Sequence, residues 1–576
     1  GHTQRPWLVP LSATEASPFG PSSQGWRISE VQDAKAKANA ETSNGEADET
    51  VICHVAADGF EERMVPFPVP SGSYRDLAVV KDGVVWIEVA DRGGELGATR
   101  AGVTGEAPSD VLWHYNLSAR HLDKLCERVD TFSVSGDGER LVVRHRDDTI
   151  VVPSSHKVDD DDPAYIRVDL TRLRRTVNPR AEWRQMFDEN GRLMASHYWR
   201  EDMNGVDWDG VLNRYRPLVD LCHVVDDLHD ILWETVAELN TSHSYVSASG
   251  AAGDSDMRAG LLGADVSSGD DGARVVRVIP GESSDPRAWS PLRAAGVAVT
   301  EGDVIVAVDG RKVGADGNLG ELLEGSAGRV VELTVRRGEN ERQVAVVPMA
   351  DEAPLRYHDW VASRRRYVEE HSGGRLGYLH VPDMVSDGWA ELHRQIGEAT
   401  RHEGVIADVR FNHGGHTSQL VVERLARRVV GWDYSRWYAT ADTYPQNAVR
   451  GPIVMVTNQW AGSDGDIVAA ATQAMGYAKV IGERSWGGVV GIDGRFDLVD
   501  GTSVTQPRYA GWYGSYGWGV ENHGVDPDIV VTVSPEDWEA DCDVQLDAAI
   551  AECLRQLDDK PAATAPELPG PAFDRC

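Results

Sequence analysis

Short apolar runs separated by polar turns make up the first part of the chain. The runs DLAVVKDGVVWIEV (76–89) and TFSVSGDGERLVVRHRDDTIVV (131–152) are rich in β-branched residues, and each is interrupted by an Asp-Gly turn. This pattern predicts β-hairpins. The two turns are about 55 residues apart, a spacing within reach of four-stranded propeller blades. Two repeats are too few to close a propeller, so residues 1–155 are predicted to be its C-terminal blades.

Two polar stretches interrupt this region. AKAKANAETSNGEADET (34–50) is polar and contains no aromatic residue, so it is predicted to be a mobile insertion. HKVDDDDP (156–163) opens a segment, 156–179, that is predicted to be an acidic linker. A metal ion could visit this charge run, but a solvated surface is the simpler interpretation.

Between about 180 and 240 the hydrophobic period changes to that of an amphipathic helix. Apolar residues recur there at spacings of three and four, and the stripe consists of Val225, Leu228, Leu232, Val236 and Leu239. It ends at ELNTSHSY, so residues 180–250 are predicted to be a small helical domain.

Short strands and glycines follow over residues 256–350. The segment contains GLLG (260–263), VVRVIPG (275–281) and GVAVTEGDVIVAVDGRKV (296–313). It resembles a PDZ domain, which binds peptides by adding a strand to the open edge of its sheet.

From 351 to 558 apolar strands alternate with helical stretches. GRLGYLHV, GVIADVRF, GPIVMVTN and AKVIGERS read as buried strands, separated by helical segments such as 417–429 and 466–476. This alternation predicts an α/β domain whose central strands are largely parallel. The segment 559–576 is predicted to be a disordered tail.

The composition excludes some classes of partner. The chain has 57 basic and 92 acidic residues and a net charge of −35, so nucleic acid is an unfavourable partner. No run approaches 18 apolar residues, which argues against a membrane partner. Six scattered cysteines without a CxxC pair suggest neither a disulfide framework nor a zinc site, and a cytoplasmic location is expected. The chain starts at Gly1, so it can be a piece of a longer protein.

The stretch NQWAGSDGD (458–466) has the form strand, sharp turn and helix. Ligands of α/β sheets bind at the carboxyl ends of the strands, where this turn must lie. Ser463 is a candidate nucleophile there, because the helix N-terminus favours negative charge and the Asp464 N–H has no helical partner. The alternative is that Ser463 only caps the helix.

A second strand, in DVRFNHGG (408–415), also ends in a glycine loop. The backbone N–H of Gly414 or Gly415 could point into the same pocket as that of Asp464. Two such amides form an oxyanion hole. A plain turn remains the alternative.

A serine nucleophile needs a base, because its hydroxyl is hardly ionised at neutral pH. Among 18 histidines, His243 stands out because it follows an amphipathic helix and is flanked by hydroxyl residues in NTSHSY. His413 and His416 could suggest a metal, but there is no HExxH and no obvious carboxylate partner. Motifs for nucleotide binding, GxxxxGK[ST] and GxGxxG, are absent, so no cofactor is expected.

These motifs occur in a fixed order around the PDZ-like segment: ELNTSHSY, DVRFNHGG, NQWAGSDGD, RSWGGVVGI and VENHGVDPDI. In this combination the chain resembles the C-terminal half of a tricorn protease, a self-compartmentalising serine peptidase. The resemblance implies propeller blades, a helical domain, a PDZ domain and an α/β catalytic domain. It also implies oligopeptide substrates (proteasome products among them), a hexameric homo-oligomer and aminopeptidases acting downstream.

The resemblance assigns four side chains to catalysis. Ser463 matches the family nucleophile, and His243 matches the general base. Ser242 matches the residue that orients the imidazole, and Glu521 matches the acid that supports Ser242. Residues alone do not link Glu521 to His243.

Three further positions follow from the resemblance. The N–H groups of Gly415 and Asp464 match the oxyanion hole. Asp433, in VGWDYSR, matches an acid at the base of the primary specificity pocket, which favours Lys or Arg before the scissile bond; a strand-end aspartate is the alternative. The family usually has glycine where this chain has His413, so loop geometry or substrate fit is expected to differ there.

The sequence therefore predicts a cytoplasmic serine endopeptidase with an acyl-enzyme mechanism. Two alternatives remain open. One is a catalytically silent scaffold of PDZ and propeller domains, which would be expected to lack one of the four catalytic positions. The other is an esterase-type α/β hydrolase that uses the same serine.

Overall fold

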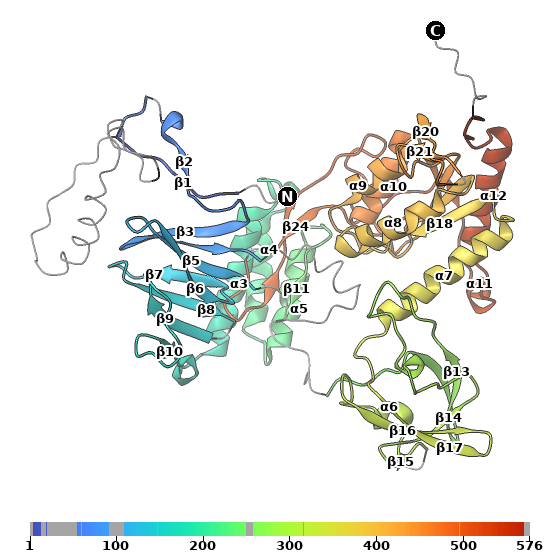
Figure 1. Ribbon diagram of the computed structural model, residues 1–576, viewed down its shortest axis with the longest axis horizontal. Coiled ribbons are helices and arrows are strands. Elements are labelled where there is room, and N and C mark those ends of the chain that lie inside the picture. The colour runs from blue at the N-terminus through green and yellow to red at the C-terminus, as the bar shows by residue number, and fades with distance from the viewer. Residues whose placement is uncertain are drawn as a thin grey trace, which may run out of the picture. The chain divides into compact units, whose positions relative to one another are not determined.

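The computed structural model describes most of the chain, in ten stretches: 4–12, 19, 55–58, 60–90, 109–146, 148–248, 257–314, 316–438, 440–494 and 496–568. The chain divides into two compact units (Figure 1). The first consists of Gly1–Arg175 with Ser284–Pro286, and the second of Thr176–Ser283 with Arg287–Cys576. The insertion predicted at 34–50 lies outside the described residues.

The first unit contains two antiparallel sheets of four strands, with the orders β3-β4-β5-β6 and β10-β9-β8-β7. The strands are β3 (Tyr74–Val80), β4 (Gly83–Glu88), β5 (Val111–Asn116), β6 (His121–Glu127), β7 (Thr131–Val134), β8 (Arg140–His145), β9 (Asp148–Pro153) and β10 (Ile166–Val168). Sequential four-stranded sheets are the unit of a β-propeller blade. The predicted blade architecture is therefore confirmed.

Three short elements precede these sheets: β1 (Trp7–Leu8), η1 (Glu61–Arg63) and β2 (Val65–Pro66). Strand β10 lies inside the segment predicted to be an acidic linker. It pairs with β9 along Ile166–Val168 and completes the second sheet. The sequence pattern misses it because only three residues pair and charged residues precede them.

The second unit begins with three helices, which form the predicted helical domain. They are α3 (Pro179–His197), α4 (Trp208–Val219) and α5 (Val225–Ala237), with the short helix η3 (Met203–Gly205) between α3 and α4. The short helix η2 (Leu170–Arg172) precedes them and belongs to the first unit. Asn178 and Asp207 start α3 and α4 by accepting backbone N–H groups, as N-caps do. The predicted stripe on α5 is buried except at Val225, the first helical residue.

A short strand pair joins this helical domain to the C-terminal part of the chain. Strand β11 (Val246–Ser247) pairs antiparallel with β25 (Ser503–Val504). Leu498 and Val504 are buried in the same core as the helices. Because β11 follows His243 by only three residues, this pairing carries the histidine to the α/β domain.

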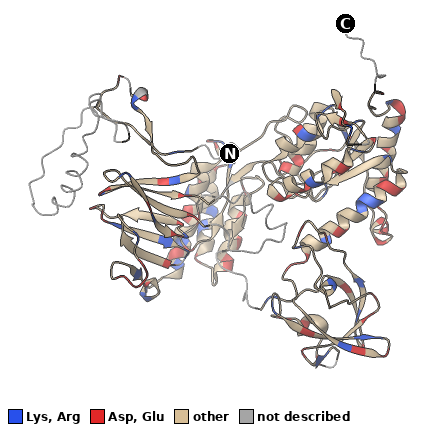
Figure 2. Ribbon diagram, viewed as in Figure 1, with Lys and Arg blue, Asp and Glu red and all other residues tan. Residues whose placement is uncertain are grey.

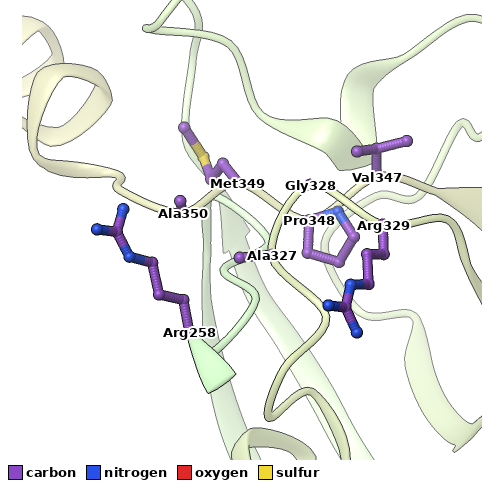
Figure 3. Close-up of a pocket in the computed structure, with 8 residues that line it drawn as sticks. All are labelled: Arg258, Ala327, Gly328, Arg329, Val347, Pro348, Met349 and Ala350. Carbon is purple, nitrogen blue, oxygen red and sulfur yellow. The ribbon is translucent and has the colours of Figure 1, made fainter. Parts of the chain in front are cut away.

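The PDZ-like domain is an antiparallel sheet of order β12-β13-β14-β16-β17, with β15 paired to β14. Its elements are β12 (Ala264–Gly269), β13 (Gly272–Val278), η5 (Pro291–Arg293), β14 (Val304–Val308), β15 (Arg311–Lys312), α6 (Leu319–Leu322), β16 (Val331–Arg337) and β17 (Asn340–Val346). An open concavity of about 800 Å³ lies on this domain, with Arg258 and Arg329 on its rim (Figure 3).

The α/β domain is built on a five-stranded parallel sheet of order β18-β19-β22-β23-β27. The strands are β18 (Leu376–His380), β19 (Gly404–Asp408), β22 (Ile453–Thr457), β23 (Ala478–Gly482) and β27 (Ile529–Val530). The helices are α7 (Ala353–His371), α8 (Ser386–Ala399), α9 (Ser418–Leu425), α10 (Asp464–Met475), α11 (Pro535–Glu539) and α12 (Val544–Asp559). The predicted α/β architecture is confirmed.

Helices cover both faces of this sheet, which explains the continuous apolar strands. Figure 1 shows β18 lying between α8 and α12. Neighbouring strand residues point to opposite faces: Val405 and Ala407 pack with the core of α8, α9 and α10, while Ile406 packs with the core of α7 and α12. Because β19 and β22 are parallel neighbours, the loops at their carboxyl ends lie at the same edge of the sheet.

Two small hairpins complete the domain, β20 (Gly431–Asp433) with β21 (Asp442–Tyr444) and β24 (Gly491–Asp493) with β26 (Gln506–Tyr509). Part of the predicted disordered tail is described. The N–H of Ala563 donates to Arg450 O at 2.8 Å, and the Tyr434 hydroxyl donates to Pro566 O. Residues 569–576 lie outside the described chain.

Acidic and basic residues are distributed over the elements of both units (Figure 2). In the described stretches, no helix combines the length and the hydropathy that a membrane span requires. The acidic residues are thus not confined to one element of the described chain.

Candidate active site

Ser463 occupies a strained turn between β22 and α10. Its φ of 58° and ψ of −119° lie outside the regions that non-glycine residues favour. The preceding strand is buried throughout, and the helix starts at the next residue, Asp464. A serine on a sharp, strained strand-to-helix turn presents its hydroxyl at the top of the sheet. The side chain of Ser463 does not cap the helix, which excludes the simple capping alternative.

The glycine loop after β19 lies directly against this turn. The N–H of Gly462 donates to Asn412 O at 3.0 Å, and the Asn458 side chain accepts the N–H of Phe411 at 3.0 Å. At Gly414, which has a φ of 77°, an added Cβ would lie 2.5 Å from Ser463 Cβ. Only glycine permits this close approach, so the two loops meet as predicted.

The two amides predicted to form an oxyanion hole have no competing partner in the described part of the chain. Among the described residues, neither the N–H of Gly415 nor that of Asp464 donates a hydrogen bond. Gly415 is held by neighbouring bonds instead, from Met384 N to Gly414 O at 2.7 Å and from His416 N to Met384 O at 2.8 Å. The Asp464 side chain accepts the N–H of Ser418 at 3.0 Å and so fixes the start of α9.

His413 fits this loop without the third glycine. Its backbone has an ordinary negative φ, and its N–H donates to Pro382 O at 3.0 Å. Its side chain is exposed. Positive φ angles occur in this loop at Phe411, Gly414 and Gly415 but not at His413, so a side chain at 413 fits the backbone of the loop.

His243 is the last member of a hydrogen-bonded relay. Its Nδ1 lies 3.1 Å from Ser242 Oγ, and the Ser242 hydroxyl donates to Glu521 Oε2 at 3.0 Å. The backbone N–H of Ser242 donates to Glu521 Oε1 at 2.7 Å. The structure therefore brings together three of the predicted side chains that come from distant parts of the sequence.

Glu521 accepts four hydrogen bonds in all. Besides the two from Ser242, the N–H groups of Val489 and Val490 donate to Oε2 at 2.8 and 3.0 Å. A carboxylate with four donors is held in one orientation. Since the hydroxyl proton of Ser242 goes to this acceptor, the Ser242 oxygen accepts from Nδ1–H of His243, and Nε2 of the ring is left unprotonated.

The imidazole of His243 is kept in its neutral form. Burial lowers the pKa of His243 below its usual value, while the charge of Glu521 and the backbone of Val490 act in the opposite direction. Burial prevails, so the ring is neutral at pH 7 and can accept a proton. Among the described residues, Ser463 Oγ makes no hydrogen bond to His243, and such bonds are often longer in enzymes without substrate.

Trp486 contacts both His243 and the turn that carries Ser463, and the sequence did not mark it as a site residue. Its ring meets the His243 ring edge to face, with centroids 5.4 Å apart, and its backbone N–H donates to Ala461 O at 3.0 Å. The indole packs on Gly462, where an added Cβ would lie 2.7 Å from it. The only sequence signal was the tryptophan in RSWGGVVGI.

Asp433 takes part in none of these contacts among the described residues. It is exposed at the end of β20, opposite Asp442 on β21. Its carboxylate makes no hydrogen bond or ion pair with a described residue. Its predicted role in a specificity pocket stays a prediction.

In the described part of the chain, no group of three His, Cys, Asp or Glu side chains is arranged to hold a metal ion. A cavity of about 500 Å³ borders the relay, lined by Trp199, Trp518 and Glu521 among others. The relay brings together a hydroxyl, an imidazole and a carboxylate, from Ser242, His243 and Glu521.

Three family models match successive parts of the chain. The Tricorn protease C1 domain matches residues 179–237, the Tricorn protease PDZ domain matches 260–351, and Peptidase family S41 matches 375–531. These ranges correspond to the helical domain, the PDZ-like domain and the α/β domain.

Curated relatives and a solved structure agree with these models. Tricorn protease homolog 1 of Streptomyces coelicolor is 53% identical over 98% of this chain and 52% of its own length. The Tricorn protease of Thermoplasma acidophilum is 34% identical over 86% of this chain and 46% of its own. A crystal structure of the tricorn protease superposes with a TM-score of 0.83 at 31% identity, covering 96% of this chain and 51% of that one. The chain thus spans about half the length of the relatives it matches.

Proposed function

Because the chain belongs to the tricorn protease family, we propose that it carries the catalytic machinery of a serine-type endopeptidase. One observation carries the proposal: the relay from Glu521 through Ser242 leaves Nε2 of His243 free to accept a proton. Trp486 contacts both this histidine and the strained Ser463 turn. All four residues that the family uses for catalysis are present, which argues against a silent scaffold.

In the proposed acylation step, Ser463 Oγ attacks the carbonyl carbon of the scissile peptide bond. The hydroxyl proton passes to Nε2 of His243 as the O–C bond forms. The electron pair of the carbonyl moves onto its oxygen. When the intermediate collapses, the C–N bond breaks, and His243 returns the proton to the leaving amine.

The developing oxyanion requires hydrogen-bond donors that are already in place. The N–H groups of Gly415 and Asp464 are suited to this because no described residue accepts them. Asp464 is also the first residue of α10, where the helix dipole favours negative charge. Loss of one such donor typically lowers turnover by about 10²–10³-fold.

Deacylation reverses the roles of the same groups. A water molecule gives its proton to His243 Nε2 and attacks the ester carbonyl. The intermediate then releases a carboxylate product, and Ser463 Oγ recovers its proton from His243. During both steps the imidazolium is stabilised by Ser242 and the charge of Glu521.

The substrates that we propose are oligopeptides, with the products of a proteasome-type protease among them. We propose a homo-oligomer, hexameric by the family resemblance, in the cytoplasm, with aminopeptidases acting on its products. Asp433 is proposed to favour Lys or Arg before the scissile bond. These finer proposals are supported by the family resemblance, and Asp433 has a carboxylate available for pairing.

A panel of fluorogenic peptides tests the function. Wild type and Ser463→Ala are assayed in the full-length protein, with Lys, Arg or aromatic residues before the cleaved bond and with matched ester substrates. We expect peptide cleavage by the wild type and none by Ser463→Ala. Equal activity in both proteins, or a covalent phosphonate adduct at another residue, contradicts the mechanism. Cleavage of esters alone supports the esterase alternative.

A further inference from the structure

Asp466 is a fully buried carboxylate in the first turn of α10, three residues after Ser463. It accepts the hydroxyl of Ser485 and the N–H groups of Gly487 at 2.8 Å and Gly488 at 3.3 Å. The backbone of Ser463 also hydrogen-bonds to this carboxylate. One side chain thus binds the nucleophile turn and a separate segment, 485–488.

Segment 485–488 holds Trp486 between two of the residues that Asp466 binds. The backbone N–H of Trp486 donates to Ala461 O at 3.0 Å, and its ring meets the ring of His243 at 89°. Gly488 also lies against the indole, since an added Cβ there would come within 2.2 Å of it. Asp466 therefore fixes the backbone on both sides of the residue that contacts the base.

The same segment continues directly into the relay. After Gly488, the N–H groups of Val489 and Val490 donate to Glu521. A shift of Gly487 or Gly488 would carry these two donors with it. The orientation of Glu521, and through Ser242 that of His243, depends on where Asp466 holds the chain.

The loop that carries Glu521 is bound to this segment as well. The N–H of Val525 donates to Ser485 Oγ at 2.8 Å, and the N–H of Asn522 donates to Gly487 O at 2.7 Å. At Gly524 an added Cβ would lie 2.2 Å from Ser485 O, so the two backbones are in close contact. Ser485 thus links Asp466 to the loop of Glu521 through a single hydroxyl.

We propose that Asp466 is a positioning residue that couples the Ser463 turn to His243 by holding segment 485–490 against both. The inference rests on the proposed peptidase function and adds a residue that does not touch the substrate. The carboxylate of Asp466 must be ionised for this role, because it is the acceptor in all of these hydrogen bonds. An acid O–H would replace one acceptor with a donor.

The surroundings of Asp466 permit this form at neutral pH. Burial raises the pKa of Asp466 to about 6, against the lowering effect of its bonds to Ser485, Gly487, Gly488 and Ser463. The titratable group that its charge acts on is Tyr513, whose pKa burial raises to about 12 and which the charge of Asp464 also affects. Asp466 is therefore ionised at pH 7.5 and becomes protonated as the pH falls through about 6.

Steady-state kinetics of Asp466→Asn in the full-length protein test the inference, with Ser485→Ala as a second, smaller change. We expect kcat at pH 7.5 to fall by about 10²-fold in Asp466→Asn, as misplacement of catalytic groups does, while KM changes little. Ser485→Ala should lower kcat less. Asp303→Asn, which alters a buried carboxylate of the PDZ-like domain bound to Arg337, is the matched control and should keep wild-type kinetics.

The pH profile of kcat/KM separates positioning from a merely structural role. In the wild type, protonation of either His243 or Asp466 lowers the rate, so log(kcat/KM) should fall with a slope approaching 2 once the pH is below both pKa values. In Asp466→Asn only His243 titrates, and the slope should be 1. Wild-type kcat with an unchanged slope in Asp466→Asn overturns the inference. If Asp466→Asn does not fold, a Ser485→Ala variant whose kcat and pH profile of kcat/KM equal those of the wild type overturns it. An inactive wild type with no phosphonate labelling of Ser463 rejects the proposed function instead.

Discussion

Ser242 and Glu521 are 279 residues apart in the chain, yet two hydrogen bonds join them. The carboxylate accepts both the backbone N–H and the hydroxyl of Ser242. Because the hydroxyl has one proton, its oxygen accepts from Nδ1 of His243 at 3.1 Å. This relation determines the tautomer of the imidazole, and the first prediction tests it.

Replacement of Glu521 by Gln should abolish the correct tautomer. A Gln amide group can donate to Ser242 Oγ, and the hydroxyl would then donate to Nδ1 of His243, which places the ring proton on Nε2. We expect kcat to fall by about 10²–10⁴-fold, as it does when the orienting acid of a catalytic triad becomes an amide. Peptide cleavage at pH 7.5 measures this. Glu341→Gln, an exposed change on β17, should have no effect, and near-normal turnover in Glu521→Gln would rule out the relay.

Replacement of Trp486 by Ala should move the acid limb of the pH profile. Burial lowers the pKa of His243 below 6.5, and the indole covers one edge of its ring. Removal of the indole admits water, so the pKa of His243 should rise towards 6.5 and the rate should begin to fall at a higher pH. The measurement is kcat/KM between pH 4.5 and 8. The control is Trp538→Ala, whose side chain is 77% exposed; a limb that stays in place in Trp486→Ala contradicts this account.

A side chain at Gly414 should disturb the nucleophile turn directly. In Gly414→Ala the new Cβ would lie 2.5 Å from Ser463 Cβ, in addition to the strain of a positive φ. We expect a loss of stability of about 1–3 kcal/mol and a large fall in kcat. Gly373→Ala is the matched control, because its φ is also positive (61°) but nothing lies within 4 Å of the added Cβ. Denaturant unfolding measures the backbone strain that both variants share, and peptide cleavage measures the effect of the contact with Ser463. Equal activity in Gly414→Ala and Gly373→Ala would contradict the close approach of the two loops.

Asp433→Asn should reduce cleavage after basic residues if Asp433 lines the specificity pocket. Loss of the ion pair is expected to lower kcat/KM for Lys and Arg substrates by about 10-fold, which corresponds to about 1.4 kcal/mol, and to leave apolar substrates unaffected. Asp442→Asn is the matched control, since Asp442 lies directly opposite on the same hairpin. If the basic preference survives in Asp433→Asn, or is lost equally in both variants, Asp433 has no specific role.

The buried charge network under the sheet edge should control folding stability. Arg410 is 5% exposed and pairs with Asp408 at 2.7 Å and Asp543 at 2.8 Å. Burial raises the pKa of Asp543, but the Arg410 charge and the hydrogen bonds from Arg410, Leu546 and Arg364 together outweigh burial, so the pKa is lowered. Asp543→Ala should therefore cost about 3–5 kcal/mol at pH 7 because it leaves a buried charge partly unpaired.

The pH dependence of this stabilisation has a definite sign. Since the folded-state pKa of Asp543 is depressed, its contribution is present above the unfolded pKa of about 3.9 and is lost as the pH falls through the folded pKa. Urea unfolding at pH 7 and pH 3 should show a smaller difference between wild type and Asp543→Ala at pH 3. Asp559→Ala, at an exposed helix end, is the control. An equal cost at both pH values would contradict the charge argument.

Local pattern was sufficient for most of the fold. Continuous apolar runs predicted β18, β19, β22 and β23 because helices cover both faces of a parallel sheet. Runs of β-branched residues around Asp-Gly turns predicted the blade strands. Ser463 was placed on a strand-turn-helix by its immediate neighbours alone. The pattern missed β10, because three paired residues after an acidic run carry too little signal.

The site depended far more on tertiary structure. The sequence marked Ser463, Asp464 and Gly414 or Gly415 as candidate nucleophile and oxyanion donors, because each lies in a turn that follows a buried strand directly. Only the fold decided that Glu521 binds Ser242, that Trp486 contacts His243, and that Asp466 holds the segment between them. The physical reason is that a hydrogen bond or a ring contact selects its partner by position in space, and β11 and segment 485–490 bring these partners together from positions that no local spacing relates.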